Sequence, residues 1–396
     1  MPSMHNFKKK LITTLSRKRR KAFSIKEYIS LLISSTDYLL SNKDPIYNGK
    51  YQKKFENDFC NSFGGGFSKA VNSGTNGIYI AIRSLELPIG SKIGVTALID
   101  PGVVNAIIIA GYEPVLLDIV SKDKLYLSST EIYRAIDLNI VALILVHYYG
   151  YSAPAQYFSS ICRRHNIKLI EDCSQCHYGS DSGKRIGLFG DIAVFSTMSR
   201  KSTITGASGG IIYTLDKNLY QKISSFSDRG KDTISQYSNP RKCSENINIS
   251  LNFNTDEFSS AIGISSLRRL KTSTIKRLKL AKFCQSHLMS IPGVHTPLFC
   301  SKDCPFIIPI FFSNEIKDNI INSFNSYGID FSNEYDQCAS KWPWLLSYIS
   351  HNEKLINSED FARNHLLLYI HEGYNIFYRY LFKQAIKEIK NSILTN

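Results

Sequence analysis

The stretch from Lys168 to Lys201, KLIEDCSQCHYGSDSGKRIGLFGDIAVFSTMSRK, decides the fold. It holds two short apolar runs, Lys168–Ile170 and Ile192–Phe195, and each ends in polar residues. The first run leads into Asp172, whose carboxylate suits a cationic ring nitrogen or a metal, or else caps the next helix. The second run leads into Lys201. This lysine is either a solvated surface residue or one that forms a Schiff base with a carbonyl group.

The same alternation extends from about residue 70 to residue 215. Further apolar runs occupy Lys92–Thr96, Pro114–Asp118, Val141–Val146 and Ile211–Tyr213, with helical stretches between them. Strands that alternate with helices predict a mostly parallel sheet covered by helices on both faces. Ligands of such sheets bind at the carboxyl ends of the strands. We therefore predict an α/β fold in which the polar residues that follow each strand carry the function.

Beyond Asn252 the pattern changes to long helical stretches, followed by shorter strands and helices. The chain is predicted to contain three parts. Residues 1–45 form a basic arm and an amphipathic helix, residues 46–280 a large cofactor-binding domain, and residues 281–396 a smaller α+β domain.

Two further motifs follow or precede predicted elements. Asn72 to Gly77, NSGTNG, stands before a helical stretch, where free N–H groups attract anions; an ordinary capped helix is the alternative. His147 follows the run Val141–Val146 and either contacts a ligand or only satisfies its own loop. A phosphate cradle, an acid that keeps a ring nitrogen protonated and a Schiff-base lysine are together what pyridoxal phosphate requires.

With these motifs the chain resembles the DegT/StrS-type sugar aminotransferases from about Lys50 to Gly263, and more weakly beyond. The matching motifs, in the family's order, are Ser73-Gly74-Thr75, Asn105-Ala106 to Gly111 with Pro114-Val115 and Asp118, Val146 to Gly150, Glu171 to Gln175, Gly190-Asp191 with Phe195-Ser196 and Lys201, and Asn252-Phe253-Asn254 through Gly263. Six motifs in one order at matching spacings are highly specific. The resemblance implies a transferase of the aspartate-aminotransferase type (fold type I), with pyridoxal 5'-phosphate (PLP) as cofactor.

The resemblance also implies a role for each matching residue. Lys201 would hold the cofactor, Asp172 would pair with its pyridine nitrogen, and Gln175 would lie by the ring. The residues that would bind its phosphate are Gly74, Thr75, Asn76 and Ser196. Asn252 would reach the phosphate of the other subunit's cofactor, which implies a homodimer with shared sites. His147 joins Lys201 and Asp172 as a candidate catalytic residue, and no metal is expected.

Three residues depart from the family's pattern. Asp100 stands where the family usually has an aromatic side chain stacked on the ring. Ser208, preceded by Ala207, replaces the acid of its GEGG motif, and Asn254 replaces an arginine. These departures bear on substrate geometry more than on cofactor attachment.

The function predicted from the resemblance is transfer of an amino group from glutamate or glutamine to a nucleotide-linked keto-sugar, for bacterial surface polysaccharide and lipopolysaccharide biosynthesis. Two alternatives stay open. A sugar dehydratase of the same family would carry histidine at the position of Lys201. A non-catalytic PLP-binding regulatory protein would explain Asp100 and Ser208, but not why Lys201 and Asp172 are both present.

The composition of the chain indicates its partners and its cellular compartment. The 396 residues carry a net charge of +15, and nine of the basic residues, with no acid, lie in residues 1–26. The arm at residues 5–26 is predicted either to rest on an anionic membrane surface or to stay solvated, and it has no nucleic-acid-reading motif. Nine scattered cysteines and no membrane-spanning apolar run predict a cytoplasmic protein with reduced thiols. The CxxC of Cys173 and Cys176 lacks a supported second ligand pair for zinc.

Overall fold

The structure is a computed structural model that describes residues 23–42, 44–45, 48–232, 243–333, 336–351, 353–363 and 365–394. Of the arm predicted to contact a membrane, only residues 23–26 fall inside these ranges.

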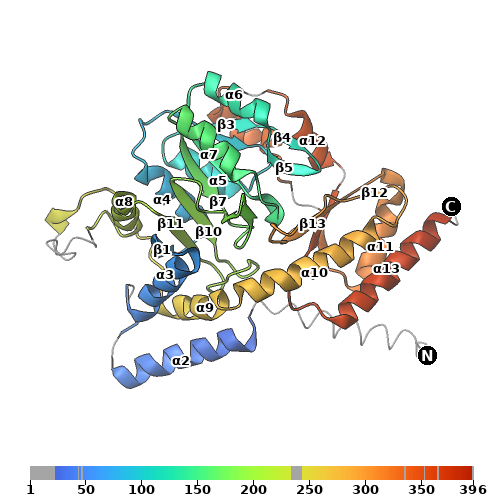
Figure 1. The fold of residues 1–396 in the computed structure, drawn as a ribbon, viewed down its shortest axis with the longest axis horizontal. Helices are drawn as coiled ribbons and strands as arrows, with labels where there is room; N and C mark the ends of the chain where they lie inside the picture. The colour runs from blue at the N-terminus through green and yellow to red at the C-terminus, as the bar shows by residue number, and fades with distance from the viewer. Residues whose placement is uncertain are drawn as a thin grey trace.

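A seven-stranded sheet forms the centre of the molecule (Figure 1). In spatial order its strands are β1 Phe67–Val71, β11 Gly210–Thr214, β10 Ile192–Ser196, β7 Lys168–Asp172, β6 Ile140–Val146, β2 Lys92–Thr96 and β3 Glu113–Leu117. β11 pairs antiparallel with both of its neighbours, and all pairs from β10 to β3 are parallel. Because such strands are buried on both faces, their sequences are continuous apolar runs. The predicted mostly parallel α/β sheet is confirmed.

Helices cover both faces of this sheet. One face packs on α4 Gly74–Ser84, α5 Pro101–Ile109 and α8 Lys217–Ser227, and the other on α3 Lys50–Phe63, α6 Ser129–Asp137, α7 Ala155–Arg164 and α9 Glu257–Leu267. Successive strand residues alternate between the two layers: Val194 of β10 belongs to the first core and Phe195 to the second. This is the side-chain alternation of any strand, with apolar residues at both positions.

The long helix α10, Leu270–Leu288, leads from the large sheet to a second one (Figure 1). The second sheet is antiparallel, and its strands in spatial order are β12 Val294–His295, β13 Ile307–Phe312, β15 His365–Tyr369 and β14 Phe331–Ser332. Further elements are the hairpins β4 Ile119–Ser121 with β5 Lys124–Leu127 and β8 Ser180–Asp181 with β9 Lys184–Arg185, and the helices α11 Lys317–Tyr327, α12 Ile356–Arg363 and α13 Ile376–Leu394. The predicted domain limits at residues 45 and 280 stay predictions, and α10 continues across residue 280.

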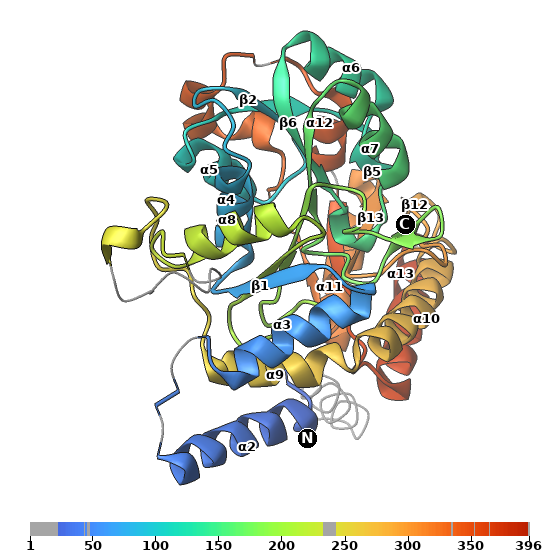
Figure 2. The same cartoon turned by 60° about the vertical axis from the view of Figure 1, so that its left-hand side comes forward.

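The predicted amphipathic helix forms as α2, Ile25–Ser41, and lies at the outer edge of the molecule against α9 (Figure 2). Its polar face is turned inward. Glu27 is fully buried and pairs with Arg269 of the α9–α10 junction at 2.6 Å. Its apolar face is turned outward, with Leu32 67% and Leu39 81% exposed. Among the described residues, none of the helices has the length and apolar character needed to cross a bilayer.

Candidate active site

A cavity of about 260 Å³ lies at the carboxyl ends of the central parallel strands. Seven of the predicted site residues line it: Gly74, Thr75, His147, Asp172, Gln175, Ser196 and Lys201. They come from four sequence motifs, which span 127 positions of the chain from Gly74 to Lys201. A larger groove of about 920 Å³ lies between the start of α2, the α9–α10 junction and Glu372, and none of the predicted site residues lines it.

The N-terminus of α4 forms one wall of the cavity. Ser73 caps this helix, and its Oγ accepts a hydrogen bond from the Asn76 N–H at 3.1 Å. Gly74 packs directly on Ser196, where a Cβ would come within 2.7 Å of the Ser196 Cβ. Small residues on both sides therefore leave the remaining N–H groups of the first turn open to the cavity, where a phosphate would be stabilised. The Asn76 side chain instead donates to Asn72 Oδ1 at 2.7 Å and does not line the cavity.

Lys201 and Asp172 bring an amine and a carboxylate to the same cavity. Asp172 ends β7, and its Oδ1 accepts from the Ser174 N–H at 2.9 Å. Burial raises the pKa of Asp172, although the bond from Ser174 and the charge of Lys201 act in the opposite direction. Burial also lowers the pKa of Lys201 to about 8, against the raising effect of Asp172. An amine with this pKa is partly neutral near physiological pH and is able to react with a carbonyl group.

Gln175 is held by the loop that follows β6. Its Oε1 accepts a hydrogen bond from the Tyr149 N–H at 2.7 Å. Tyr149 has a positive φ of 53°, an uncommon backbone conformation for a bulky residue, and its hydroxyl contacts Gln337. The amide of Gln175 is thus fixed at the cavity wall by its oxygen, and its nitrogen remains available as a donor.

These residues fit PLP by their chemistry. A helix N-terminus suits the phosphate, a buried carboxylate suits the pyridine nitrogen, and a buried lysine suits the aldehyde. The match to known proteins agrees with this fit. A model of the DegT/DnrJ/EryC1/StrS aminotransferase family matches residues 36–375.

The chain belongs to this family.

Individual relatives are more distant. The chain is 28% identical to GDP-perosamine synthase of Escherichia coli O157:H7 over 270 residues, which are 68% of this chain and 70% of that protein. Its fold matches that of Helicobacter pylori PseC, an aminotransferase of pseudoaminic acid biosynthesis, with a TM-score of 0.81 and 22% identity over 93% of this chain and 97% of that one. It also matches GDP-4-keto-6-deoxymannose-3-dehydratase with a trapped PLP–glutamate geminal diamine, with a TM-score of 0.81 and 20% identity over 93% and 98%.

Membership of the DegT/DnrJ/EryC1/StrS family confirms the predicted family, fold type and enzyme class. The prediction of PLP as the cofactor is confirmed at the level of the family, in which a solved relative holds a PLP–glutamate adduct. The role of each residue in this chain stays a prediction.

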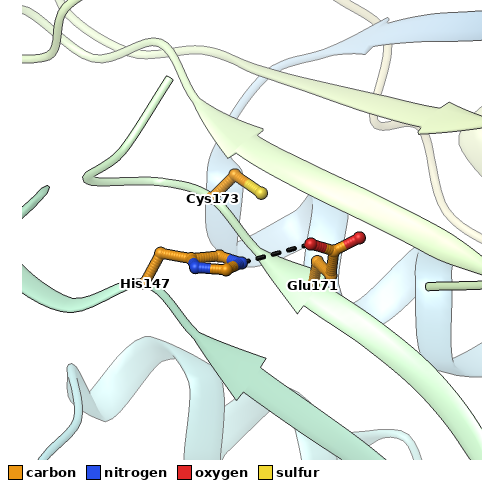
Figure 3. Close-up of side chains that lie close together, drawn as sticks. All are labelled: His147, Glu171 and Cys173. Carbon is orange, nitrogen blue, oxygen red and sulfur yellow. Dashed lines mark hydrogen bonds and ion pairs between the residues drawn. The ribbon is translucent and has the colours of Figure 1, made fainter. Parts of the chain in front are cut away.

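In this family member His147 serves a buried network (Figure 3). Its Nδ1 accepts from the Ala153 N–H at 3.1 Å, so its Nε2 carries the proton and faces Glu171 Oε2 at 3.2 Å. Both ring nitrogens are thereby occupied, which favours a positioning role over the predicted catalytic one. Glu171 also accepts hydrogen bonds from the backbone N–H groups of Gly187, Phe189 and Gly190.

His147, Glu171 and Cys173 are close enough together to be considered as metal ligands (Figure 3). Two of the three are already engaged, because the carboxylate of Glu171 receives three backbone N–H groups and His147 Nδ1 receives the Ala153 N–H. Burial raises the pKa of the Cys173 thiol well above its usual value, whereas a metal ligand must be a thiolate. The donor set therefore fits a structural network better than a metal site.

Asn252 lies outside the cavity of its own chain. Its Oδ1 accepts from the Asn254 side chain at 2.9 Å, and its backbone forms a bridge with Asp228. The predicted contact with a cofactor phosphate therefore requires a second chain.

Sequence reasoning missed Arg277 of α10. This arginine is fully buried, its Nε contacts Glu372 at 2.7 Å, and its Nη2 lies 3.4 Å from the Lys201 carbonyl oxygen. It supports the loop that carries Lys201. The only signal in the sequence is a basic residue within a helical stretch that is basic throughout, which does not distinguish it from its solvated neighbours.

Proposed function

We propose that the protein is a PLP-dependent aminotransferase that transfers an amino group from glutamate or glutamine to a nucleotide-linked keto-sugar for bacterial surface polysaccharide biosynthesis. The observation that carries the proposal is the meeting of Lys201, Asp172 and the α4 N-terminus around one cavity. The named relatives, a perosamine synthase and a pseudoaminic acid aminotransferase, support the sugar as the class of substrate.

Bound PLP supplies an electron sink for the carbon atom from which a proton is removed. Lys201 Nζ takes this proton and returns it, because its lowered pKa of about 8 lets it act as base and then as acid. Asp172 would hold a positive charge on the ring nitrogen. The α4 N-terminus, with Thr75 and Ser196, would bind the phosphate, and Gln175 would orient the ring from the cavity wall that it lines.

The dehydratase of the same family is the closest rival. Its solved structure shares this fold, so the fold does not separate the two activities. Lys201 supports amination, because that branch of the family carries histidine at this position.

The deciding experiment incubates the purified protein with glutamate and follows the visible band of the bound cofactor. Conversion to the pyridoxamine form, reversed by a keto-sugar with formation of an amino sugar, is the expected result. Loss of a sugar hydroxyl without amination would identify a dehydratase.

A homodimer with shared sites is part of the proposal. Asn252 does not line the cavity of its own chain, and the segment before it exposes Ile249 and Leu251 by 92% and 69%. This segment continues into α9, where Tyr38 of α2 contacts Glu257. The apolar face of α2 and the segment before Asn252 are both exposed in the single chain, which supports a second copy of the chain as the cover of both.

The last part of the proposed function is contact of residues 5–26 with an anionic membrane. It is supported by nine basic residues and no acid in residues 1–26. Each such residue near anionic lipid contributes about 1 kcal/mol. The test is sedimentation with vesicles of phosphatidylcholine with and without phosphatidylserine, using the full chain and a form that lacks residues 1–22. Equal sedimentation of both forms at low salt would rule out the contact.

A further inference from the structure

Asp100 introduces a second carboxylate into the cavity that holds Lys201 and Asp172. The family pattern places an aromatic side chain at this position, so the cavity has exchanged an apolar ring for a charged group. An amine that faces two carboxylates in a buried site experiences a different field from one that faces a single carboxylate and an apolar ring.

The position of Asp100 is fixed by its backbone. It caps α5, and its Oδ1 accepts from the Gly102 N–H at 2.9 Å. Just before it, the Ile99 N–H donates to the Gln337 carbonyl at 2.9 Å, which ties this loop to the segment near residue 338. The carboxylate therefore cannot swing away with its loop.

Gly102 brings the starts of α4 and α5 together. A Cβ at this glycine would lie 2.5 Å from Thr75 Oγ1 and 3.0 Å from Asp100 Oδ1, so a larger residue would displace these side chains. Asp100 accordingly stands beside Thr75, at the same wall of the cavity as the α4 N-terminus. Its charge reaches both functional groups across the cavity, since it raises the pKa of Lys201 and also that of Asp172.

We propose that Asp100 is a positioning residue that holds positive charge on Lys201 Nζ, in place of the ring-stacking side chain that the family pattern leads one to expect. Asp172 and Asp100 then act on the amine together, from β7 and from the start of α5. The same carboxylate would favour a positive charge on the Lys201 nitrogen when the cofactor is bound, because a negative charge at this wall favours the charged form.

The other charged or titratable groups near Lys201 act in the opposite direction or not at all. Arg277 of α10 lowers the pKa of Lys201, as burial does. His177, in the loop after β7, is buried with its pKa lowered to about 3, so it stays neutral over the range of the experiment. Lys201 Nζ also lies 4.6 Å from the centre of the Phe306 ring, which favours its charged form at any pH. Asp100 and Asp172 are therefore the two charged groups whose removal should lower this pKa.

The experiment measures the pKa of Lys201 in the cofactor-free protein, from the pH dependence of its modification by an amine reagent with peptide mass spectrometry. Asp100→Asn keeps the side-chain cap of α5, since asparagine caps helices as well as aspartate does. We expect the Lys201 midpoint to fall by about 1 pH unit in this variant. Asp216→Asn is the matched control, because Asp216 caps α8 through the Asn218 N–H at 2.7 Å, away from the cavity.

A midpoint unchanged in Asp100→Asn, or shifted equally in Asp216→Asn, would overturn the proposal. Asp100→Ser, a second variant that retains a cap, guards against misfolding of the first, and it should shift the midpoint in the same direction. In the PLP-loaded protein, the pH midpoint of the visible absorption band should also fall in Asp100→Asn. The measurement on the free amine needs no turnover, so it stands even if the proposed amination fails.

Discussion

Glu171 Oε2 lies 3.2 Å from His147 Nε2, and both side chains are completely buried. Glu171 also accepts from the backbone N–H groups of Gly187, Phe189 and Gly190, in the loop before β10. This one carboxylate therefore joins the end of β6, the end of β7 and the approach to β10. Asp172 is the residue after Glu171 in β7. The contact between His147 and Glu171 therefore also holds the Asp172 carboxylate in place.

Replacement of Glu171 by alanine should destabilise the protein strongly. Three backbone N–H groups and one imidazole N–H would lose their acceptor in a buried site, and each such loss costs about 1–3 kcal/mol. We expect the free energy of unfolding in urea to fall by at least about 3 kcal/mol. Glu86→Ala is the control, because the Glu86 side chain is 51% exposed in a surface pair with Lys222. Equal losses in both variants would contradict the role of Glu171.

The lowered pKa of Lys201 should appear in the pH dependence of stability. The folded value is about 8 and the ordinary value 10.5, so between these the unfolded chain binds more protons. The stability of the cofactor-free wild type relative to Lys201→Met should therefore rise with pH across this window, by at most about 3 kcal/mol. Urea unfolding from about pH 7 to about pH 10 measures the difference. Lys53→Met, at an exposed position in α3, is the control, and a flat or falling difference for Lys201 would refute the assignment.

Asp172→Ala should separate attachment of the cofactor from turnover. Lys201 remains in the cavity of this variant, so borohydride reduction followed by peptide mapping should still place PLP on Lys201. The ring nitrogen would lose its carboxylate partner, and we expect turnover to fall by at least about 100-fold. Turnover near the wild-type value, or a label on another lysine, would show that the roles are assigned wrongly.

The strands that carry the site could be predicted from sequence, whereas β1 could not. β10 is apolar up to Phe195, and β7 holds the apolar Leu169 and Ile170 before its two carboxylates, because both strands are buried on both faces. β1, Phe67–Val71, carries Ser68 and Lys69 in its centre. Lys69 is nevertheless buried, with Nζ 3.6 Å from Glu56 Oε1 and 2.5 Å from Asn48 Oδ1. Because this buried lysine is paired with residues distant in sequence, the strand shows neither a continuous apolar run nor an alternation of apolar and polar residues.

The candidate site shows the same division. Motif order predicted that Lys201, Asp172 and Gly74 belong together, and the structure places them around one cavity. The direction of a side chain was not predictable, since Asn76 turns to Asn72 and His147 to Glu171. The hydrogen-bond partner of each side chain depends on which buried donors lack an acceptor in the folded chain. A local sequence pattern does not contain this information.

Shared sites predict complementation between two inactive chains. Lys201→Ala lacks the amine, and Asn252→Ala lacks the residue proposed to act in the partner subunit. Mixed under conditions of subunit exchange, the two should form hybrid dimers with one intact site, and about a quarter of the wild-type activity should return at equal amounts. A mass-tagged chain verifies exchange. Exchange without any recovery of activity would mean that Asn252 acts within its own chain or not at all.

The outward apolar face of α2 predicts that charge placed there breaks the dimer. Leu32 and Leu39 are 67% and 81% exposed in the single chain, and both lie on the face opposite the buried Glu27. In the dimer, a glutamate at either position would be buried in the interface without a partner, at a cost of several kcal/mol. In the monomer it would remain exposed to water, so the stability of the single chain would hardly change. Light scattering should therefore show monomers for Leu32→Glu and Leu39→Glu and a dimer for the wild type.

The matched control is Leu215→Glu, since Leu215 is 61% exposed at the end of β11, away from α2. This variant should remain dimeric. Monomers in all three variants would point to general destabilisation, which urea unfolding would reveal. If the α2 variants stay dimeric but no longer sediment with anionic vesicles, α2 faces the membrane and the second copy must bind elsewhere. If the α2 variants stay dimeric and bind vesicles as the wild type does, neither a second copy of the chain nor a membrane covers this helix. Because the hybrid experiment needs subunit contact, monomeric α2 variants should also fail to complement an Asn252→Ala chain.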